Sequence, residues 1–232
     1  TLESILKDHL HLAGLINAKI KVFPHFEKYL KQGYYPFYRE ELDLYEQRVE
    51  EVINMMLEIE LPLLRGMDIG LVPKIKQLLV IISESVPFVP NIVNLSKKIE
   101  IHRTTLMSYL FYLQELGLTY HLVKEASGSV RLQKPAKIYL GNTNLMYVLS
   151  SFSANRGNVK ETFFANQVGY KHKISFHEKT DFLVDNTFAF EIVGKDKSKK
   201  QITGIENAYI VSDEIEYGYQ NKIPIWLFGF LN

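Results

Sequence analysis

Cysteine is absent from this chain of 232 residues. Its absence excludes disulfide bonds, cysteine-ligated zinc sites and thiol catalysis, and it fits a reducing cytoplasm, which is the location we expect. Long apolar runs are also missing: residues 78–82 and 223–231 fall far short of the roughly 20 residues that a membrane helix requires. The first residues show no signal-peptide pattern. We therefore expect no membrane partner.

Net charge is nearly absent as well, because 27 Lys and Arg residues stand against 26 Asp and Glu residues. A chain that bound nucleic acid through its overall charge would be strongly basic, so such a partner would have to be bound by a local patch. A hydrophobic content of 47% with 23% charged residues is typical of globular proteins. The length favours more than one domain.

A phosphate-binding loop of the GxxxxGK[ST] type is missing too. Gly194 and Lys195 come nearest to it, but the loop needs a glycine five residues earlier, where Ala189 stands. The sequence also lacks the HExxH and GxSxG motifs. The chain starts at Thr1 inside an amphipathic helical pattern. This start predicts a fragment whose N-terminal part has been removed.

What is present in the first 60 residues is mainly helical periodicity. Apolar residues near 3.6 spacing predict a helix over residues 1–30, and a second helix with an acidic, solvated face is expected over 40–60. Between them, Gly33 and Pro36 break the pattern within an aromatic-rich turn.

Residues 73–139 carry the signals of a winged helix-turn-helix. Four positions suit helix ends, namely a proline in a first turn, two capping residues and a terminating glycine. They are Pro73, Asn91, Thr104 and Gly117. Strands are expected at 118–124 and 130–139, joined by a turn at 127–128. Three helices followed by a hairpin define this motif.

The last helix of this motif presents short polar side chains that suit base edges and phosphates. These candidate nucleic-acid-binding residues are His102, Arg103, Thr104, Thr105 and Ser108. The hairpin adds the cations Arg131, Lys134 and Lys137. About four phosphate contacts would give weak, salt-sensitive binding to DNA. The alternative is that the motif only packs against neighbouring domains.

Residues 142–232 predict an α/β domain, with helices followed by clustered strands. The helices are expected at 142–149, 158–168 and 195–202, and the strands at 173–177, 180–184, 188–193, 208–211 and 223–227. Candidate catalytic residues in this part are Glu161, Asp181, Glu191 and Lys195. Asp181 and Glu191 flank a tight turn and are expected at the same end of the sheet. There they can hold Mg²⁺, with the lysine activating water. Acids at strand ends are also common without any such role.

The chain resembles prokaryotic AAA+ ATPase-like proteins that carry a C-terminal domain of unknown function. The resemblance rests on FEKYLKQGYYPFY at residues 26–38, LMSYLFYLQELG at 106–117, KPAKIY at 134–139, KETFF at 160–164, TDF at 180–182 and FEIVGK at 190–195. It implies an absent N-terminal ATPase domain that binds ATP. It also implies a helical lid-like segment over 1–70, a winged helix over 71–140 and a domain similar to PD-(D/E)XK nucleases over 141–232.

The resemblance also assigns roles to the acidic residues. Glu161 matches the acid of the first nuclease helix, Asp181 the motif aspartate and Glu191 the acid of the E-x-K element. Val193 stands where the lysine belongs. Lys195 lies two residues further on, where a strand side chain points to the same face, so it could substitute. This departure favours a degenerate site.

Three functional hypotheses remain open. The first is an accessory region of an AAA+ ATPase-like protein that binds DNA and has no ATPase activity of its own. The second is a Mg²⁺-dependent DNA nuclease. The third is a structural or partner-binding module, for example an oligomerisation surface or a contact with the ATPase domain.

Overall fold

The computed structural model describes residues 1–124, 133–149, 155–194 and 202–231. These residues form a mixture of helices and strands, which confirms the predicted mixed α and β class. Contacts divide the chain into two compact units, Lys31–Ala154 on the one hand and Thr1–Leu30 with Asn155–Asn232 on the other. The predicted segment 1–70 is thus shared between the units, and the three predicted domain limits stay predictions. None of the described helices is long and apolar enough to cross a membrane.

The unit of residues 31–154 opens with a nearly continuous helical stretch. Its elements are η1 (Pro36–Arg39), η2 (Leu42–Leu44), α3 (Tyr45–Met55), the π-turn η3 (Met56–Glu60) and α4 (Leu61–Arg65). Buried residues recur every four positions, at Tyr45, Val49, Ile53, Leu57 and Leu61. A four-residue spacing drifts around a regular helix of 3.6 residues per turn, and the wider π-turn keeps the stripe on the buried side.

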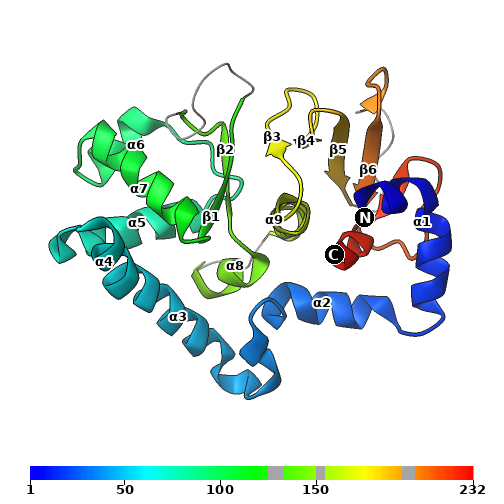
Figure 1. The fold of residues 1–232 in the computed structure, drawn as a ribbon, viewed down its shortest axis with the longest axis horizontal. Helices are drawn as coiled ribbons and strands as arrows, with labels where there is room; N and C mark the ends of the chain where they lie inside the picture. Colours follow the sequence, from blue (N-terminus) through cyan, green and yellow to red (C-terminus); the bar gives the residue numbers. More distant parts are fainter. Residues whose placement is uncertain (125–132, 150–154, 195–201, 232) are drawn as a thin grey trace. The chain divides into compact units, whose positions relative to one another are not determined.

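The remaining elements of this unit are η4 (Ile69–Leu71), α5 (Val72–Ser83), α6 (Ile92–Lys98), α7 (Arg103–Glu115), β1 (Thr119–Leu122), β2 (Lys137–Leu140) and α8 (Thr143–Leu149). Figure 1 shows three of these helices, α5, α6 and α7, together beside the hairpin of β1 and β2. β1 and β2 pair antiparallel, as predicted. The predicted turn between them lies outside the described residues. Phe88 bridges Ile138 through two backbone hydrogen bonds of 2.8 Å, so a third short segment joins the hairpin.

Most of the predicted helix-end signals in this unit are confirmed. Pro73 lies in the first turn of α5, the Asn91 side chain accepts a hydrogen bond from the backbone of Asn94, and Gly117 adopts a positive φ of 70° just after α7. The prediction for Thr104 is wrong. His102 takes the extended cap conformation, so α7 begins at Arg103 and Thr104 lies inside the first turn.

The other unit is built on a five-stranded sheet in the order β3-β4-β5-β6-β7. The strands are β3 (Ile174–Ser175), β4 (Phe182–Val184), β5 (Phe188–Val193), β6 (Ala208–Ser212) and β7 (Lys222–Pro224). β3, β4 and β5 pair antiparallel, whereas β6 and β7 continue the sheet in parallel. Asp185 and Asn186 both have positive φ values, as a tight two-residue turn between β4 and β5 requires.

Helices of the N-terminal segment belong to this same unit. They are α1 (Leu2–Asn17) and α2 (Val22–Gln32), and α9 (Arg156–Gly169) from later in the chain joins them. The predicted helix over 1–30 is therefore interrupted between α1 and α2. His9 Nε2 lies 2.9 Å from the carbonyl oxygen of Gln220, and this hydrogen bond ties α1 to the loop before β7.

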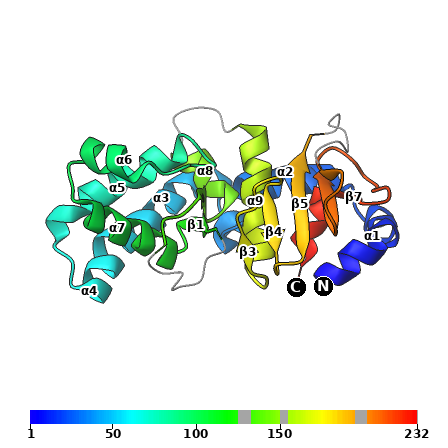
Figure 2. The same cartoon turned by 90° about the horizontal axis from the view of Figure 1, so that it is seen from above.

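An aromatic core holds α9 on one face of the sheet, where Figure 2 shows it beside β3 and β4. The ring of Phe164 packs within about 5 Å of three other rings, those of Phe182, Phe190 and Phe228. Phe228 belongs to η7 (Ile225–Phe230), a 3-10 helix. The strand predicted over 223–227 is therefore wrong beyond Pro224, because proline has no N–H to continue the ladder.

We expect Gly141→Ala to destabilise the protein by at least about 2 kcal/mol, through overpacking. A Cβ atom at Gly141 would lie 1.7 Å from the carbonyl oxygen of Gly117, a backbone atom that cannot move aside cheaply. Chemical denaturation of the full chain measures this change.

Gly14→Ala is the matched control. A Cβ atom at Gly14, inside α1, meets no atom within 4 Å, so alanine should stabilise the helix by about 0.5–1 kcal/mol. Equal stabilities of the Gly141→Ala variant and the wild type would contradict the close approach of Gly141 to Gly117.

Candidate functional site

α7 has a buried face and an outer face. Leu106, Tyr109, Leu110 and Leu113 are buried. The predicted nucleic-acid-binding residues of this helix lie mostly on the outside: His102, Arg103, Thr104 and Ser108 are exposed, whereas Thr105 is half-buried. The structure therefore brings most of the predicted polar set to one accessible surface.

A groove of about 650 Å³ runs along this outer face. Its lining combines two arginines with small polar, thioether and aromatic side chains: Arg65, Arg103, Thr104, Met107, Ser108, Phe111 and Tyr112. Positions four residues apart on a helix lie on one side, so these residues of α7 form a continuous stripe. Sequence analysis missed Met107 and Phe111 as candidates, although their spacing from Arg103 was the available signal.

Arg65 is held against the end of α7 from outside the helix. Its guanidinium pairs with the carboxylate of Glu115. It also lies 5.6 Å from the ring centroid of Tyr112, within the range of a cation–π contact. Two contacts to α7 thus fix one cation at the wall of the groove.

A second hollow lies on the other side of Met107 and Phe111, between α7 and the hairpin. Gln133 and Pro135 contribute to its wall, and so does His121 on β1. Burial lowers the pKa of His121 to about 4, so its ring is neutral near pH 7. Met107 and Phe111 therefore form a ridge with a hollow on each side.

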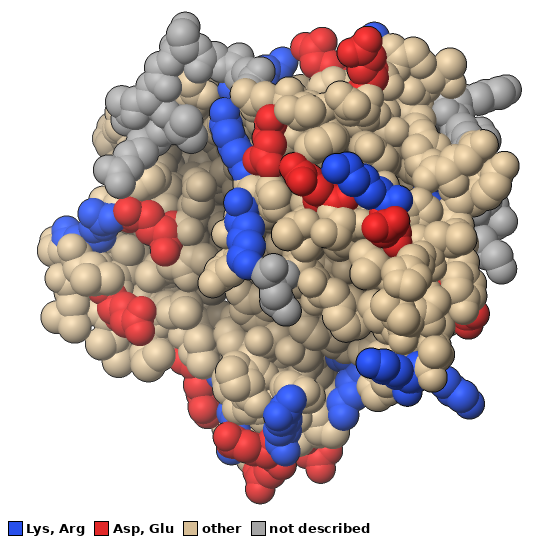
Figure 3. Space-filling view, turned by 45° about the vertical axis from the view of Figure 1, so that its right-hand side comes forward, with Lys and Arg blue, Asp and Glu red and all other residues tan. Residues whose placement is uncertain are grey.

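The predicted hairpin cations are only partly described. Lys134 is exposed and Lys137 is half-buried, while Arg131 lies outside the described residues. Figure 3 shows basic and acidic side chains interspersed on the face that it presents.

Asp181 and Glu191 come together at one end of the β4–β5 pair. Phe182 pairs with Phe190, so the next position of the ladder places Asp181 opposite Glu191 on the same face of the sheet. Asp181 Oδ2 accepts a hydrogen bond from the backbone N–H of Ile192 at 2.8 Å. Glu191 is buried and Asp181 is half-buried.

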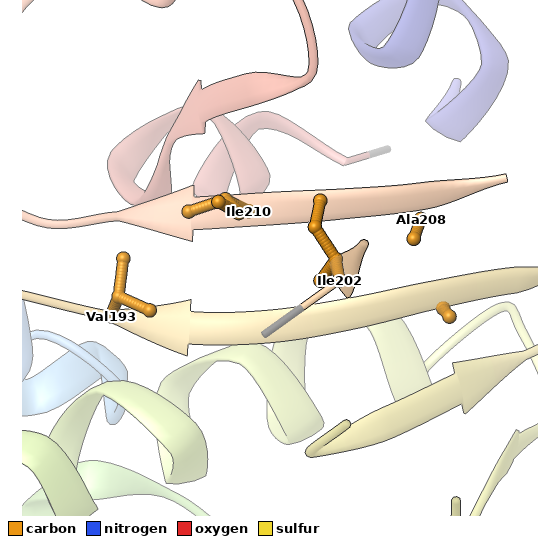
Figure 4. Packing of buried hydrophobic residues seen from close by; sticks show 5 residues of the cluster. Val193, Ile202, Ala208 and Ile210 are labelled. Carbon is orange, nitrogen blue, oxygen red and sulfur yellow. The ribbon is translucent and has the colours of Figure 1, made fainter. Parts of the chain in front are cut away.

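Val193 occupies a core position two residues beyond Glu191. It packs with Ala189, Ile202, Ala208 and Ile210, and Figure 4 shows Ile202 lying against β5 and β6. A lysine at this position would bury its ammonium group among apolar side chains, which costs free energy without a paired charge. The valine therefore has a packing role where the resemblance implies a lysine.

Of the other two predicted catalytic residues, only Glu161 is described. Glu161 is on α9, the helix whose Phe164 packs on the face of Phe182 and Phe190. Successive residues of a strand point to opposite faces, so Asp181 and Glu191 belong to the other face. Lys195 lies outside the described residues. Within the described ranges, no three His, Cys, Asp or Glu side chains lie close enough together to hold a metal ion.

A buried charge cluster that sequence analysis missed lies at the end of β6. The carboxylate of Asp213 accepts hydrogen bonds from Lys160 Nζ at 3.0 Å and Arg156 Nε at 2.9 Å. Arg156 also pairs with Glu27 at 2.6 Å, which ties α9 to α2. The available signal was a lysine between the buried residues Val159 and Thr162 of α9.

Opposing effects set the pKa of Asp213. Burial alone would raise this pKa, but hydrogen bonds and charge from Lys160 and Arg156 more than offset burial, so the pKa is lowered. The backbone N–H of Asp213 donates to the carbonyl of Val193 at 3.2 Å. The cluster therefore also fixes the ends of β5 and β6 relative to each other.

No protein-family model, curated protein or solved structure matches this chain.

We expect Lys160→Met to destabilise the protein by about 3 kcal/mol at pH 7, because it leaves the buried Asp213 carboxylate without one of its two cations. An aspartate with a lowered pKa stabilises the fold above its ordinary pKa, and this stability is lost as the pH falls through the lowered value. The difference from the wild type should therefore shrink below about pH 4. Urea denaturation between pH 2.5 and 7 measures it.

Lys171→Met is the control for this variant. Lys171 is exposed just after α9, so its replacement should change stability by less than about 0.5 kcal/mol. A difference between Lys160→Met and the wild type that stays constant down to pH 2.5 would refute the role of Asp213 ionisation.

Proposed function

We propose that this chain is a nucleic-acid-associated accessory region of an AAA+ ATPase-like protein, with residues 72–140 acting as a winged helix. The order α5, α6, α7, β1, β2 is the order of that motif. The bridge between Phe88 and Ile138 supplies the short additional strand beside the hairpin. The ATPase domain implied by the resemblance is the expected partner within the same protein, and ATP would bind there.

The joint exposure of Arg103, Thr104 and Ser108 on α7 carries this proposal. A helix that enters the major groove contacts base edges with side chains near its N-terminus, and these residues lie in the first two turns of α7. Lys134 and Lys137 of the hairpin are suited to phosphates beside that groove. Such a small number of cations predicts weak binding that declines steeply with salt.

Arg103→Ala should weaken binding to duplex DNA and reduce the slope of log affinity against log salt by about 1, because one phosphate or base contact is lost. Fluorescence anisotropy with a labelled duplex of random sequence, between 25 and 200 mM salt, measures both quantities.

Arg39→Ala provides the control, because Arg39 is a cation of η1 outside the proposed surface. It should leave affinity and slope unchanged. If the wild-type protein does not bind duplex DNA at 25 mM salt, the proposal is wrong, and the hypothesis of a partner-binding module takes its place.

A Mg²⁺-dependent nuclease is the second candidate, and the adjacency of Asp181 and Glu191 favours it. These acids can hold a metal ion with water as further ligands. The packing of Val193 in the position of the expected lysine argues against an active enzyme. We therefore infer a degenerate nuclease-like domain.

The purified chain is expected to leave plasmid DNA intact in the presence of Mg²⁺ or Mn²⁺, because the buried Val193 occupies the position at which the resemblance implies the water-activating lysine. Gel analysis of supercoiled and nicked forms after long incubation tests this expectation. Cleavage that Asp181→Asn abolishes would establish the nuclease instead.

A further inference from the structure

The outer face of α7 carries more apolar side chains than contacts with a DNA duplex would use. Beyond Arg103, Thr104 and Ser108, the same groove is walled by Met107, Phe111 and Tyr112. In the major groove of a duplex, bases present mainly hydrogen-bonding edges. Their flat faces are stacked on neighbouring bases. A duplex lying on α7 would therefore leave the aromatic part of the groove without a matching surface.

The flat face of an unpaired base supplies that matching surface. Proteins that bind single strands stack bases on aromatic side chains and place cations along the backbone. Phe111 and Tyr112 are adjacent on α7, with ring centroids 6.3 Å apart and ring planes inclined by 58°. Both side chains are half-buried, so each keeps part of its surface accessible. The groove volume of about 650 Å³ is in the range of pockets that enclose small ligands.

Cations stand on both sides of the ridge formed by Met107 and Phe111. Arg65 and Arg103 line the groove on one side. On the other side, Gln133 and Pro135 line the second hollow together with the two ridge residues, and the exposed Lys134 lies between them in the chain. A strand whose bases contact the ridge on the groove side would have its phosphates near Arg65 and Arg103. This distribution favours a polyanion with planar apolar groups over an apolar peptide.

One cation in the wall of the groove is already fixed in position by other side chains. Arg65 is held by Glu115 and lies over the ring of Tyr112, so its position is set before a ligand arrives. Holding a long side chain in place in advance reduces the entropy lost on binding.

We propose that this groove binds unpaired nucleotides that adjoin a duplex, so that the preferred ligand is a duplex with a single-stranded overhang. The duplex contacts the N-terminal turns of α7 and the hairpin, and the overhang enters the groove at Phe111 and Tyr112. This inference rests on the proposed function, because it names the form of nucleic acid that the same surface takes.

The test compares one labelled duplex in three forms: blunt, with a 3′ overhang of four thymidines and with the same overhang at the 5′ end. At constant salt, we expect one overhang form to bind the full chain about tenfold more tightly than the blunt form. Phe111→Leu, which keeps an apolar side chain but removes the ring, should abolish this preference.

A second variant and a control separate stacking from folding. Tyr112→Leu should reduce the preference in the same way. Tyr34→Leu removes an exposed ring outside α7 and should retain the full preference. Circular dichroism of all variants verifies that they are folded.

Two results overturn the inference, and they are distinguishable. If all three forms bind equally and Arg103→Ala weakens them, the proposed function stands and the groove does not take unpaired bases. If none of the forms binds at 25 mM salt, the proposed function fails together with the inference. That outcome favours the hypothesis of a partner-binding module instead.

Discussion

The packing of the inner face of α7 is the constraint on which the candidate interface depends. Leu106, Leu110 and Leu113 are almost fully buried, so the rotation of the helix about its own axis is fixed. With that rotation fixed, Arg103, Met107 and Phe111 have no position other than the outer face. Because the hairpin lies against the same helix, a change in the inner leucines would alter both walls of the ridge together.

A comparable constraint operates on β5 in the other unit. Phe190 faces the aromatic core under α9, while Ala189 and Val193 pack on the opposite face with Ile202. Glu191 lies between two core residues on that opposite face, and its environment is therefore dry and closely packed. Such surroundings suit a carboxylate held by fixed partners better than a lysine that must exchange protons with water. Close packing on both sides of β5 therefore leaves little room for a charged side chain at position 193.

Features that depend on a few neighbouring residues could be predicted from the sequence. Asn91 caps α6 with its own side chain, Gly117 ends α7 with a positive φ, and the turn at Asp185 and Asn186 joins two strands. Thr104 was mistaken for a cap because threonine favours that position, whereas the extended backbone of His102 starts the helix two residues earlier.

Features that depend on distant residues could not be predicted. The partners of Asp213 lie 57 and 53 positions away at Arg156 and Lys160, and no local pattern joins them. The groove beside α7 likewise needs Arg65, which belongs to a separate helix. For the candidate site, polar residues on a helix were recognisable one by one, whereas the ridge and the hollows exist only once the helix and the hairpin have packed.

The attachment of α1 to the loop before β7 has a consequence for the order in which the chain acquires its structure. Residues 31–154 form a contiguous unit, so all their contacts are available as soon as this stretch has left the ribosome. The other unit is discontinuous, and its contact between His9 and Gln220 can form only after Gln220 has been made. Contacts between such distant positions close slowly. We therefore expect the unit of residues 31–154 to fold first during synthesis. The apolar face of α1 stays exposed until β7 has been made.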